Sequence, residues 1–334
     1  MDNNTDAFLS VKDLVVEYTS GKSVIQAVNG VSFDLKRGET LGLVGETGAG
    51  KTTIAKSILR ILPDPPARVK GGEIWFDGQD IMKMGNDEIR KVRGARISMV
   101  FQDPMTALNP TMRIADQIAD GIRLHTKCHP KAALHKAAEM LEMVGIPKGR
   151  AREYPHQFSG GMKQRVVIAI ALACNPDLLI ADEPTTALDV TIQAQVLDLI
   201  NNLKKAKGTS MLLITHDLGV VAETCDRVAV VYAGEIVESG TIEEIFDHAA
   251  HPYTLGLFAS LPNMSKGMDR LKPIDGMMPD PSNLPNGCKF HPRCPYADEG
   301  CCEQTMELGK LSGTHYCSCK RVLADAKAAA QVEE

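Results

Sequence analysis

The sequence of 334 residues predicts an α/β fold with a mainly parallel core sheet. Three nearly continuous apolar runs carry this prediction, namely "ETLGLVG", "DLLIADEP" and "SMLLITHD". Strands that are buried on both faces of a parallel sheet have this appearance, and segments with helical spacing separate the three runs. The length is sufficient for one large domain and a smaller appendage.

The elements around this core follow from periodicity. The stretches "FLSVKDLVVEY" and "AVNGVSFDL" alternate apolar and polar residues, which predicts an antiparallel β subdomain within the first forty residues. The stretch "KTTIAKSILRIL" has helical spacing. Between about residues 103 and 160, "MRIADQIADGIRL" and "KAALHKAAEMLEMVG" predict an inserted helical subdomain.

The C-terminal part has a different composition. A Pro-, Gly- and Asn-rich stretch, "LPNMSKGMDRLKPIDGMMPDPSNLPNG", predicts an irregular linker, and a cysteine cluster follows it at residues 288–319. We therefore expect a main domain over residues 1–260 and a C-terminal extension over residues 261–334.

Charge and hydropathy exclude several functions. The net charge is −5 and no basic block follows a phosphate backbone, so nucleic acid is not expected as a partner. No apolar run is long enough for a membrane-spanning helix, and the N-terminus lacks the layout of a signal peptide. A soluble protein of the reducing cytoplasm is expected, in which a disulfide framework is not favoured. Cys128, Cys174 and Cys225 stand alone, and no role is assigned to them.

A phosphate-binding loop is predicted at "GETGAGKTT", residues 45–53, between a strand and a helix. Its glycines let successive N–H groups face phosphate oxygens, Lys51 supplies a positive charge to the β and γ phosphates, and the Thr52 hydroxyl reaches Mg²⁺. In "LLIADEP", Asp182 ends a buried strand where a carboxylate holds Mg²⁺ through water, and Glu183 is placed to polarise an attacking water. Without the loop upstream, a solvated strand end would be an adequate interpretation.

A second anion site is predicted at "FSGGMKQR", where Ser159, Gly160 and Gly161 open a helix. Taken alone, this segment is equally typical of an ordinary helix cap.

In order, "GETGAGKTT", "VFQDP", "FSGGMKQR", "LLIADEPTTALD" and "LLITHD" resemble the Walker A, Q-loop, signature, Walker B with D-loop, and switch motifs of ABC-type ATPases over roughly residues 8–260. The resemblance implies a head-to-tail dimer with ATP between the phosphate-binding loop of one subunit and the signature of the other. It implies that Gln102 senses Mg²⁺ and water, that Glu183 is the general base, that His216 binds the γ-phosphate and that Asp189 lies at the dimer seam. The implied nucleotide contacts are Tyr18 on adenine, and Gly45, Gly48, Gly50, Lys51, Thr52 and Thr53 around the phosphates. Phe158 stands where the family usually has Leu.

Longer phrases, "FQDPMTALNPTMRIADQI", "YPHQFSGGMKQRVVIAIALA", "ADEPTTALDVTIQAQVL" and "HPYTLGLFASLP", closely resemble the ATPase subunits of dipeptide and oligopeptide importers, a group that includes nickel importers. The resemblance implies a peripheral protein at the cytoplasmic face of the membrane. Its implied partners are a second, different ATPase subunit, two transmembrane permease subunits and an extracytoplasmic substrate-binding protein. A nickel or other small-solute importer, a soluble non-transport ABC ATPase and a redox or metal sensor are the alternatives.

The cysteine cluster, "GCKFHPRCPYADEGCC" and "HYCSC", favours bound metal in a reducing compartment, although reduced thiols would also account for it. The spacing lacks the paired knuckles of a zinc ribbon, which weakens zinc without excluding it. The tail resembles the family pattern associated with a [4Fe-4S] cluster, and this implies Cys288, Cys294, Cys301 and Cys319 as ligands. Cys302 and Cys317 are alternatives for the third and fourth positions.

Overall fold

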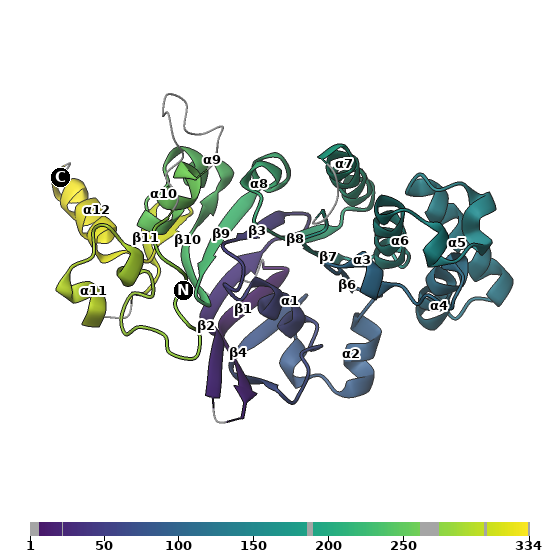
Figure 1. Cartoon of the computed structure of the whole chain (residues 1–334), viewed down its shortest axis with the longest axis horizontal. Helices are drawn as coiled ribbons and strands as arrows, with labels where there is room; N and C mark the ends of the chain where they lie inside the picture. Colours follow the sequence, from purple (N-terminus) through teal and green to yellow (C-terminus); the bar gives the residue numbers. More distant parts are fainter. Residues whose placement is uncertain (1–6, 22, 186–189, 261–273, 304–305, 333–334) are drawn as a thin grey trace. The chain divides into compact units, whose positions relative to one another are not determined.

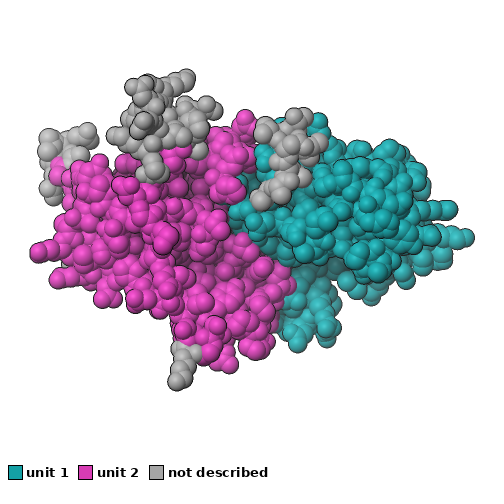
Figure 2. Space-filling view, in the orientation of Figure 1, with its two compact units in different colours: residues 1–8, 35–40, 76–215 teal, residues 9–34, 41–75, 216–334 magenta. Residues whose placement is uncertain are grey.

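The structure is a computed structural model that describes residues 7–21, 23–185, 190–260, 274–303 and 306–332. The chain forms two compact units, each assembled from three separate stretches of sequence (Figure 2). Unit 1 comprises residues 1–8, 35–40 and 76–215, and unit 2 comprises residues 9–34, 41–75 and 216–334. Residues that lie close together in either unit therefore come from distant parts of the sequence.

Unit 1 is built on three parallel strands in the order β8-β7-β6, which are Ser210–Thr215, Leu178–Asp182 and Ile97–Val100. Ile97 pairs with Leu178, and Leu178 pairs with Ser210. Every residue of the three strands is buried, which confirms the interpretation of "DLLIADEP" and "SMLLITHD" as strands covered on both faces.

Helices form most of the rest of unit 1. The predicted helices over "MRIADQIADGIRL" and "KAALHKAAEMLEMVG" are present as α4, Ile114–Thr126, and α5, Pro130–Met143. These two helices and α6, Gly160–Leu172, pack against one another (Figure 1). The remaining elements of unit 1 are β5 Gln79–Asp80, η1 Ile81–Lys83, α2 Asn86–Val92, α3 Pro104–Ala107, η2 Lys148–Arg152, η3 Pro155–Gln157 and α7 Val190–Lys207.

Unit 2 contains a mixed sheet rather than the mainly parallel one expected. Its strand order is β11-β12-β10-β9-β3, and β3, Thr40–Val44, runs parallel to β9, Arg227–Tyr232. The other pairs are antiparallel. The change of direction occurs after β9, because Ala233 and Gly234 both have positive φ, 47° and 80°, and close a tight hairpin. The strands that follow are β10 Glu235–Thr241, β11 Gly309–Ser312 and β12 His315–Cys317.

A second sheet in unit 2 has the order β2-β1-β4. Only two residues separate β1, Leu9–Ser20, from β2, Ser23–Leu35, a spacing that allows an antiparallel hairpin but not a parallel crossover. The N-terminal strands are thus antiparallel, as the alternating pattern predicts. The remaining elements of unit 2 are β4 Ala67–Phe76, α1 Lys51–Ile58, α8 Leu218–Thr224, α9 Ile242–Asp247, α10 Pro252–Ala259, η4 His291–Arg293, α11 Glu299–Glu303 and α12 Lys320–Val332.

Among the helices of the described residues, none combines the length and apolar character needed to cross a membrane.

Candidate functional site

The predicted phosphate-binding loop, residues 45–53, connects β3 to α1 in unit 2, with Gly50 as the N-cap of the helix. Gly48 and Gly50 have φ values of 89° and 100°, a region that residues with a Cβ rarely adopt. A Cβ on Gly50 would also collide with the carbonyl oxygen of Ala27. The loop conformation therefore requires glycine at these positions, as the motif predicts.

Lys51 is buried at the first position of α1. Its ammonium group donates hydrogen bonds to the carbonyl oxygens of Gly45 and Glu46, at 2.7 and 3.0 Å. The cation is thus held inside the curve of the loop, where the phosphates of a nucleotide are expected. The Tyr18 hydroxyl, on β1, lies 3.3 Å from Oγ1 of Thr53, so the structure brings this aromatic residue to the same helix end.

Glu46, the second residue of the loop, has two further partners that the sequence analysis missed. Its N–H donates to the hydroxyl of Tyr253, at 2.9 Å. Its carboxylate accepts two hydrogen bonds from the Arg293 guanidinium, at 2.7 and 3.1 Å. Hydrogen bonding to Glu46 raises the pKa of Arg293 above its usual range. The motifs "HPY" and "HPR" supply these partners, and neither motif by itself indicates what it touches.

Unit 1 brings together Gln102 and Glu183, which are predicted site residues. Nε2 of Gln102 donates to Oε2 of Glu183 at 2.7 Å. Glu183 follows β7 with φ at 46°, a strained conformation for a residue other than glycine, and its N–H donates to the Ile214 carbonyl at 2.8 Å. The backbone thus turns the carboxylate away from the strand and toward Gln102. Asp182, the last residue of β7, is buried.

The predicted signature segment opens α6 in unit 1. Oγ of Ser159 accepts a hydrogen bond from the Met162 N–H at 3.4 Å, so Ser159 is the N-cap. Gly160 and Gly161 form the first positions of the helix, where free N–H groups and the helix dipole favour an anion. Gln164, buried in the same helix, donates to the Pro184 carbonyl at 2.6 Å and ties the signature helix to the segment after Glu183.

Two further predicted site residues are His216 and Asp189. His216 follows β8 in the sequence and its side chain is exposed. Asp189, predicted at a dimer seam, lies outside the described residues.

The cysteine module, residues 288–319, lies in unit 2, and all nine cysteines of the chain, which fall within the described residues, are free thiols. Burial raises the pKa of Cys288 to about 11, and the thiolates of Cys301, Cys319 and Cys294 add to the rise. Cys294 and Cys301 also interact electrostatically with Cys319, and with each other. The four predicted ligands thus interact electrostatically with one another.

The alternative cysteines have other surroundings. Cys302 is exposed, and its thiol donates to the Asp298 carbonyl at 3.8 Å. Cys317 is buried on β12, opposite Glu238 of β10. In the described part of the chain, no group of three or more His, Cys, Asp or Glu side chains is placed to hold a metal ion.

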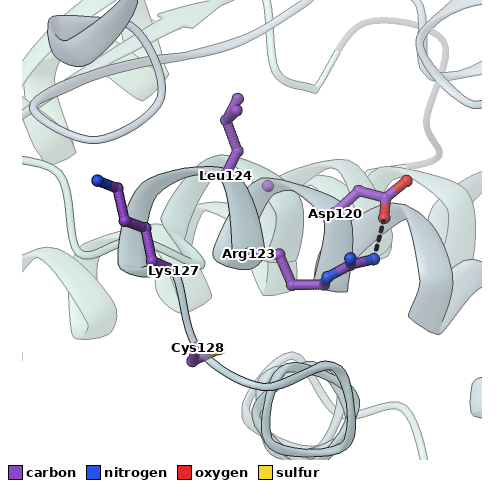
Figure 3. Close-up of a pocket in the computed structure, with 6 residues that line it drawn as sticks. Asp120, Arg123, Leu124, Lys127 and Cys128 are labelled. Carbon is purple, nitrogen blue, oxygen red and sulfur yellow. Dashed lines mark ion pairs between the residues drawn. The ribbon is translucent and has the colours of Figure 1, made fainter.

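A hollow on unit 1 has none of the predicted site residues in its lining. It is lined by Asp120, Arg123, Leu124, Lys127 and Cys128, together with Gly121, at the end of α4 (Figure 3). Asp120 and Arg123 form an ion pair of 3.7 Å on its rim, and Leu124 is 74% exposed. With one apolar side chain and an exposed ion pair, this surface does not resemble a nucleotide site.

Comparison with known proteins gives a match to two family models. Residues 28–186 match the model described as ABC transporter, and residues 237–301 match that of the oligopeptide/dipeptide transporter C-terminal region. The chain is 52% identical over 311 residues to the oligopeptide transport ATP-binding protein OppD of Bacillus subtilis, with coverage of 92% of this chain and 87% of the relative. It is also 52% identical to the dipeptide transport ATP-binding protein DppD of the same organism, with 86% of each chain covered.

Solved structures with the same fold include a dimeric post-hydrolysis state of the ATP-binding cassette MJ0796 bound to ADP and Pi. The TM-score is 0.64 at 28% identity, over 70% of this chain and 98% of that one. A second is cbiO1 of Clostridium perfringens, part of the transporter complex cbiONQ, with a TM-score of 0.62 at 29% identity, over 73% of this chain and 92% of that one. These likenesses extend the agreement from local motifs to 70% or more of the chain.

Proposed function

The chain belongs to the ATP-binding subunits of the oligopeptide and dipeptide ABC transporters, and from this premise we propose that it hydrolyses ATP to power peptide import through partner permeases. The observation that carries the proposal is the presence, in one chain, of the cassette and of the C-terminal region found in peptide transporters. This combination favours peptide import over the nickel, small-solute and non-transport alternatives.

The phosphates of ATP bind at residues 45–53 in this proposal. Lys51 already lies inside the loop through its bonds to two loop carbonyls, and it turns to the β and γ phosphates when nucleotide enters. The Thr52 hydroxyl and the Asp182 carboxylate are hard oxygen ligands of the type that Mg²⁺ prefers. Tyr18, whose hydroxyl lies 3.3 Å from Oγ1 of Thr53, is proposed to stack on the adenine.

Hydrolysis uses the carboxylate of Glu183 as general base. Gln102 donates to Oε2 of this carboxylate and orients it toward the attacking water, whose proton the carboxylate accepts. His216 contacts the γ-phosphate as it leaves, and a donor at that position stabilises the charge that develops on phosphate oxygens.

A head-to-tail dimer supplies the second half of each site. The exposed start of α6, with Ser159, Gly160 and Gly161, is a helix N-terminus able to bind the γ-phosphate of nucleotide held by a partner subunit. Asp189 is proposed at the seam. A different ATPase subunit is the proposed partner, because the related importers pair two such chains.

Two permease subunits are the proposed partners for transport, as membership of the peptide transporter family implies. Phe101 and Met105 expose apolar side chains on either side of Gln102, and this surface is proposed as the permease contact. A movement of the permease would then reach Glu183 through Gln102. The proposed location is the cytoplasmic face of the membrane, with an extracytoplasmic protein delivering the peptide.

Cys288, Cys294, Cys301 and Cys319 are proposed to hold a [4Fe-4S] cluster. Their mutual electrostatic interactions and the four-thiol donor set fit such a group. In the described part of the chain no group of three or more His, Cys, Asp or Glu side chains is placed to hold a metal ion, so the proposal rests on the donor set and on the resemblance of the tail. Bound there, the cluster would supply ligand bonds that order a loop-rich segment. Zinc is the alternative metal.

The test is reconstitution of the chain with its permeases and partner ATPase in proteoliposomes that are loaded with ATP, with the substrate-binding protein added outside. ATP-dependent uptake of a labelled oligopeptide, lost with Glu183→Gln, is the expected result. Uptake of nickel but not of peptides would contradict the proposal, as would ATP hydrolysis that is independent of the permeases and the binding protein.

A further inference from the structure

Two residues outside the phosphate-binding loop, Tyr253 and Arg293, hold its second residue, and both lie in the C-terminal region over residues 237–301. The Tyr253 hydroxyl accepts from the N–H of Glu46, and the Arg293 guanidinium binds both carboxylate oxygens of Glu46. Backbone and side chain of the same loop residue are therefore fixed at once. The geometry is bidentate, which is the strongest and most directional form of an arginine–carboxylate pair.

Arg293 has little freedom to leave this position. Its side chain is 5% exposed, whereas that of Glu46 is 32% exposed. Its Nε donates to the Asp275 carbonyl at 3.0 Å, and its Nη1 lies 3.4 Å from the Tyr232 hydroxyl. A buried guanidinium with this set of acceptors is pre-organised, so the position of the arginine determines the position of the carboxylate.

The same arginine belongs to the cysteine module. It ends the short turn η4, which lies between Cys288 and Cys294. The Cys288 carbonyl accepts from the His291 N–H at 3.1 Å, and the Cys294 N–H donates to the His291 carbonyl at 3.2 Å. The backbone of the turn is thus tied at both ends to proposed metal ligands.

Phe290, the residue before η4, packs against two tyrosines that lie beside the phosphate-binding loop. It is buried, and its ring lies 5.2 Å from that of Tyr232 and 5.4 Å from that of Tyr253. Tyr253 in turn contacts the loop through its hydroxyl. A displacement of the cysteine module would therefore reach Glu46 by two routes, the guanidinium and the aromatic cluster.

We propose that Arg293 is a positioning residue of the phosphate-binding loop, through which the cysteine module sets the affinity of this subunit for ATP. The inference rests on the proposed function of residues 45–53. A loop held in its binding shape loses less conformational freedom when nucleotide binds. The contact between Arg293 and Glu46 shapes the loop both when ATP binds and when it is hydrolysed. Its loss should therefore weaken binding of the bound ATP and of the transition state by the same factor.

The expected signature is a rise in KM for ATP with little change in kcat. MgATP and MgADP binding are measured by calorimetry on the wild-type chain purified under anaerobic conditions, which preserve the proposed cluster. We expect Arg293→Gln and Glu46→Gln each to weaken both about tenfold, and Arg293→Lys, which keeps the charge without the fork, to weaken them less. Lys310→Gln, which removes an exposed cation from the same module, is the matched control and retains wild-type affinity.

The double variant of Arg293→Gln with Glu46→Gln tests whether the two residues affect nucleotide affinity through their contact with each other. Its affinity should equal that of either single variant, because the contact is already lost in each. Additive losses would overturn the proposal, and so would unchanged affinity in both single variants. If Arg293→Gln fails to fold or loses its metal, Glu46→Gln carries the test, since it leaves the arginine in place. A wild-type chain that binds no nucleotide would instead refute the proposed function.

Discussion

Nε2 of His315 lies 2.7 Å from Oε1 of Glu238, and the two side chains are 4% and 0% exposed. The same carboxylate accepts from the N–H groups of Ala250 and His251, at 2.7 and 3.0 Å. One buried side chain of β10 thus joins β12, from the end of the cysteine module, to the segment that starts α10. The tail is attached to the sheet through this group as well as through the β10–β12 pairing.

Removing the carboxylate should destabilise unit 2 strongly. Glu238→Ala leaves three donors without their acceptor, two of them buried, and we expect the free energy of unfolding to fall by about 3 kcal/mol or more. Urea unfolding under anaerobic conditions measures this change. Glu243→Ala, an exposed glutamate on α9, is the control and should stay within about 0.5 kcal/mol of the wild type. Equal losses in the two variants would contradict the role of Glu238.

The pH dependence of stability should contain two opposing contributions. Burial lowers the pKa of His251 to about 4, despite the nearby Glu238, so the unfolded chain takes up this proton first. The neutral His251 contributes about 3 kcal/mol in total to the free energy of unfolding. This contribution is complete above the ordinary histidine pKa of 6.5 and is lost as the pH falls toward 4. Burial raises the pKa of Glu235 to about 7, despite Lys289, so its contribution is complete below 4.5 and is lost as the pH rises through 7.

Single substitutions separate these contributions. His251→Asn keeps an acceptor for the Tyr253 N–H and should make stability increase, relative to the wild type, as the pH falls from 6.5 to 4.5. Glu235→Gln should make the free energy of unfolding decrease, relative to the wild type, as the pH falls from 6.5 to 4.5. Unfolding by urea at several pH values gives the slopes. Slopes that remain parallel to the wild type in both variants would show that neither group titrates as stated.

The local features of the fold are predictable from the sequence because each depends on neighbouring residues. The phosphate-binding loop needs only its glycines between a buried strand and a helix, and the structure has this arrangement around Lys51. The helices α4 and α5 follow from apolar spacing. The strands β11 and β12 were missed, because segments of four and three residues carry too little pattern and gain their conformation from pairing with β10.

The long-range contacts of the candidate site could not be predicted. Glu46 and Arg293 are separated by 247 positions, and either residue alone is typical of a solvated surface. Glu238 sits in a strand of ordinary composition, and nothing in the sequence shows that its charge is buried. Contacts between residues so far apart in the sequence can be predicted only when the topology is known. The sequence therefore indicated the chemistry of the loop but not the residues that hold it in place.

The contact between Gln102 and Glu183 predicts different defects for its two members. Glu183→Gln removes the proposed general base, and we expect ATP hydrolysis to fall by about 10²- to 10⁴-fold while MgATP binding is retained. Gln102→Ala leaves the base in place but less well oriented, so the loss of hydrolysis should be smaller. Steady-state hydrolysis and nucleotide binding measure the two effects. Full hydrolysis by the Glu183 variant would assign the base to another residue.

The surroundings of the cysteines predict which of them are needed for metal. Cys288→Ser removes a thiol that neighbours the three other proposed ligands, and we expect loss of about four Fe and of the visible absorption of thiolate-bound iron. Cys302→Ser is the matched control, since this exposed thiol bonds to a backbone carbonyl, and it should retain the iron. Anaerobic purification with iron, sulfide and zinc analysis gives the result. Stoichiometric zinc in the wild type would replace the cluster by a structural zinc site, and iron lost equally from both variants would contradict the ligand assignment.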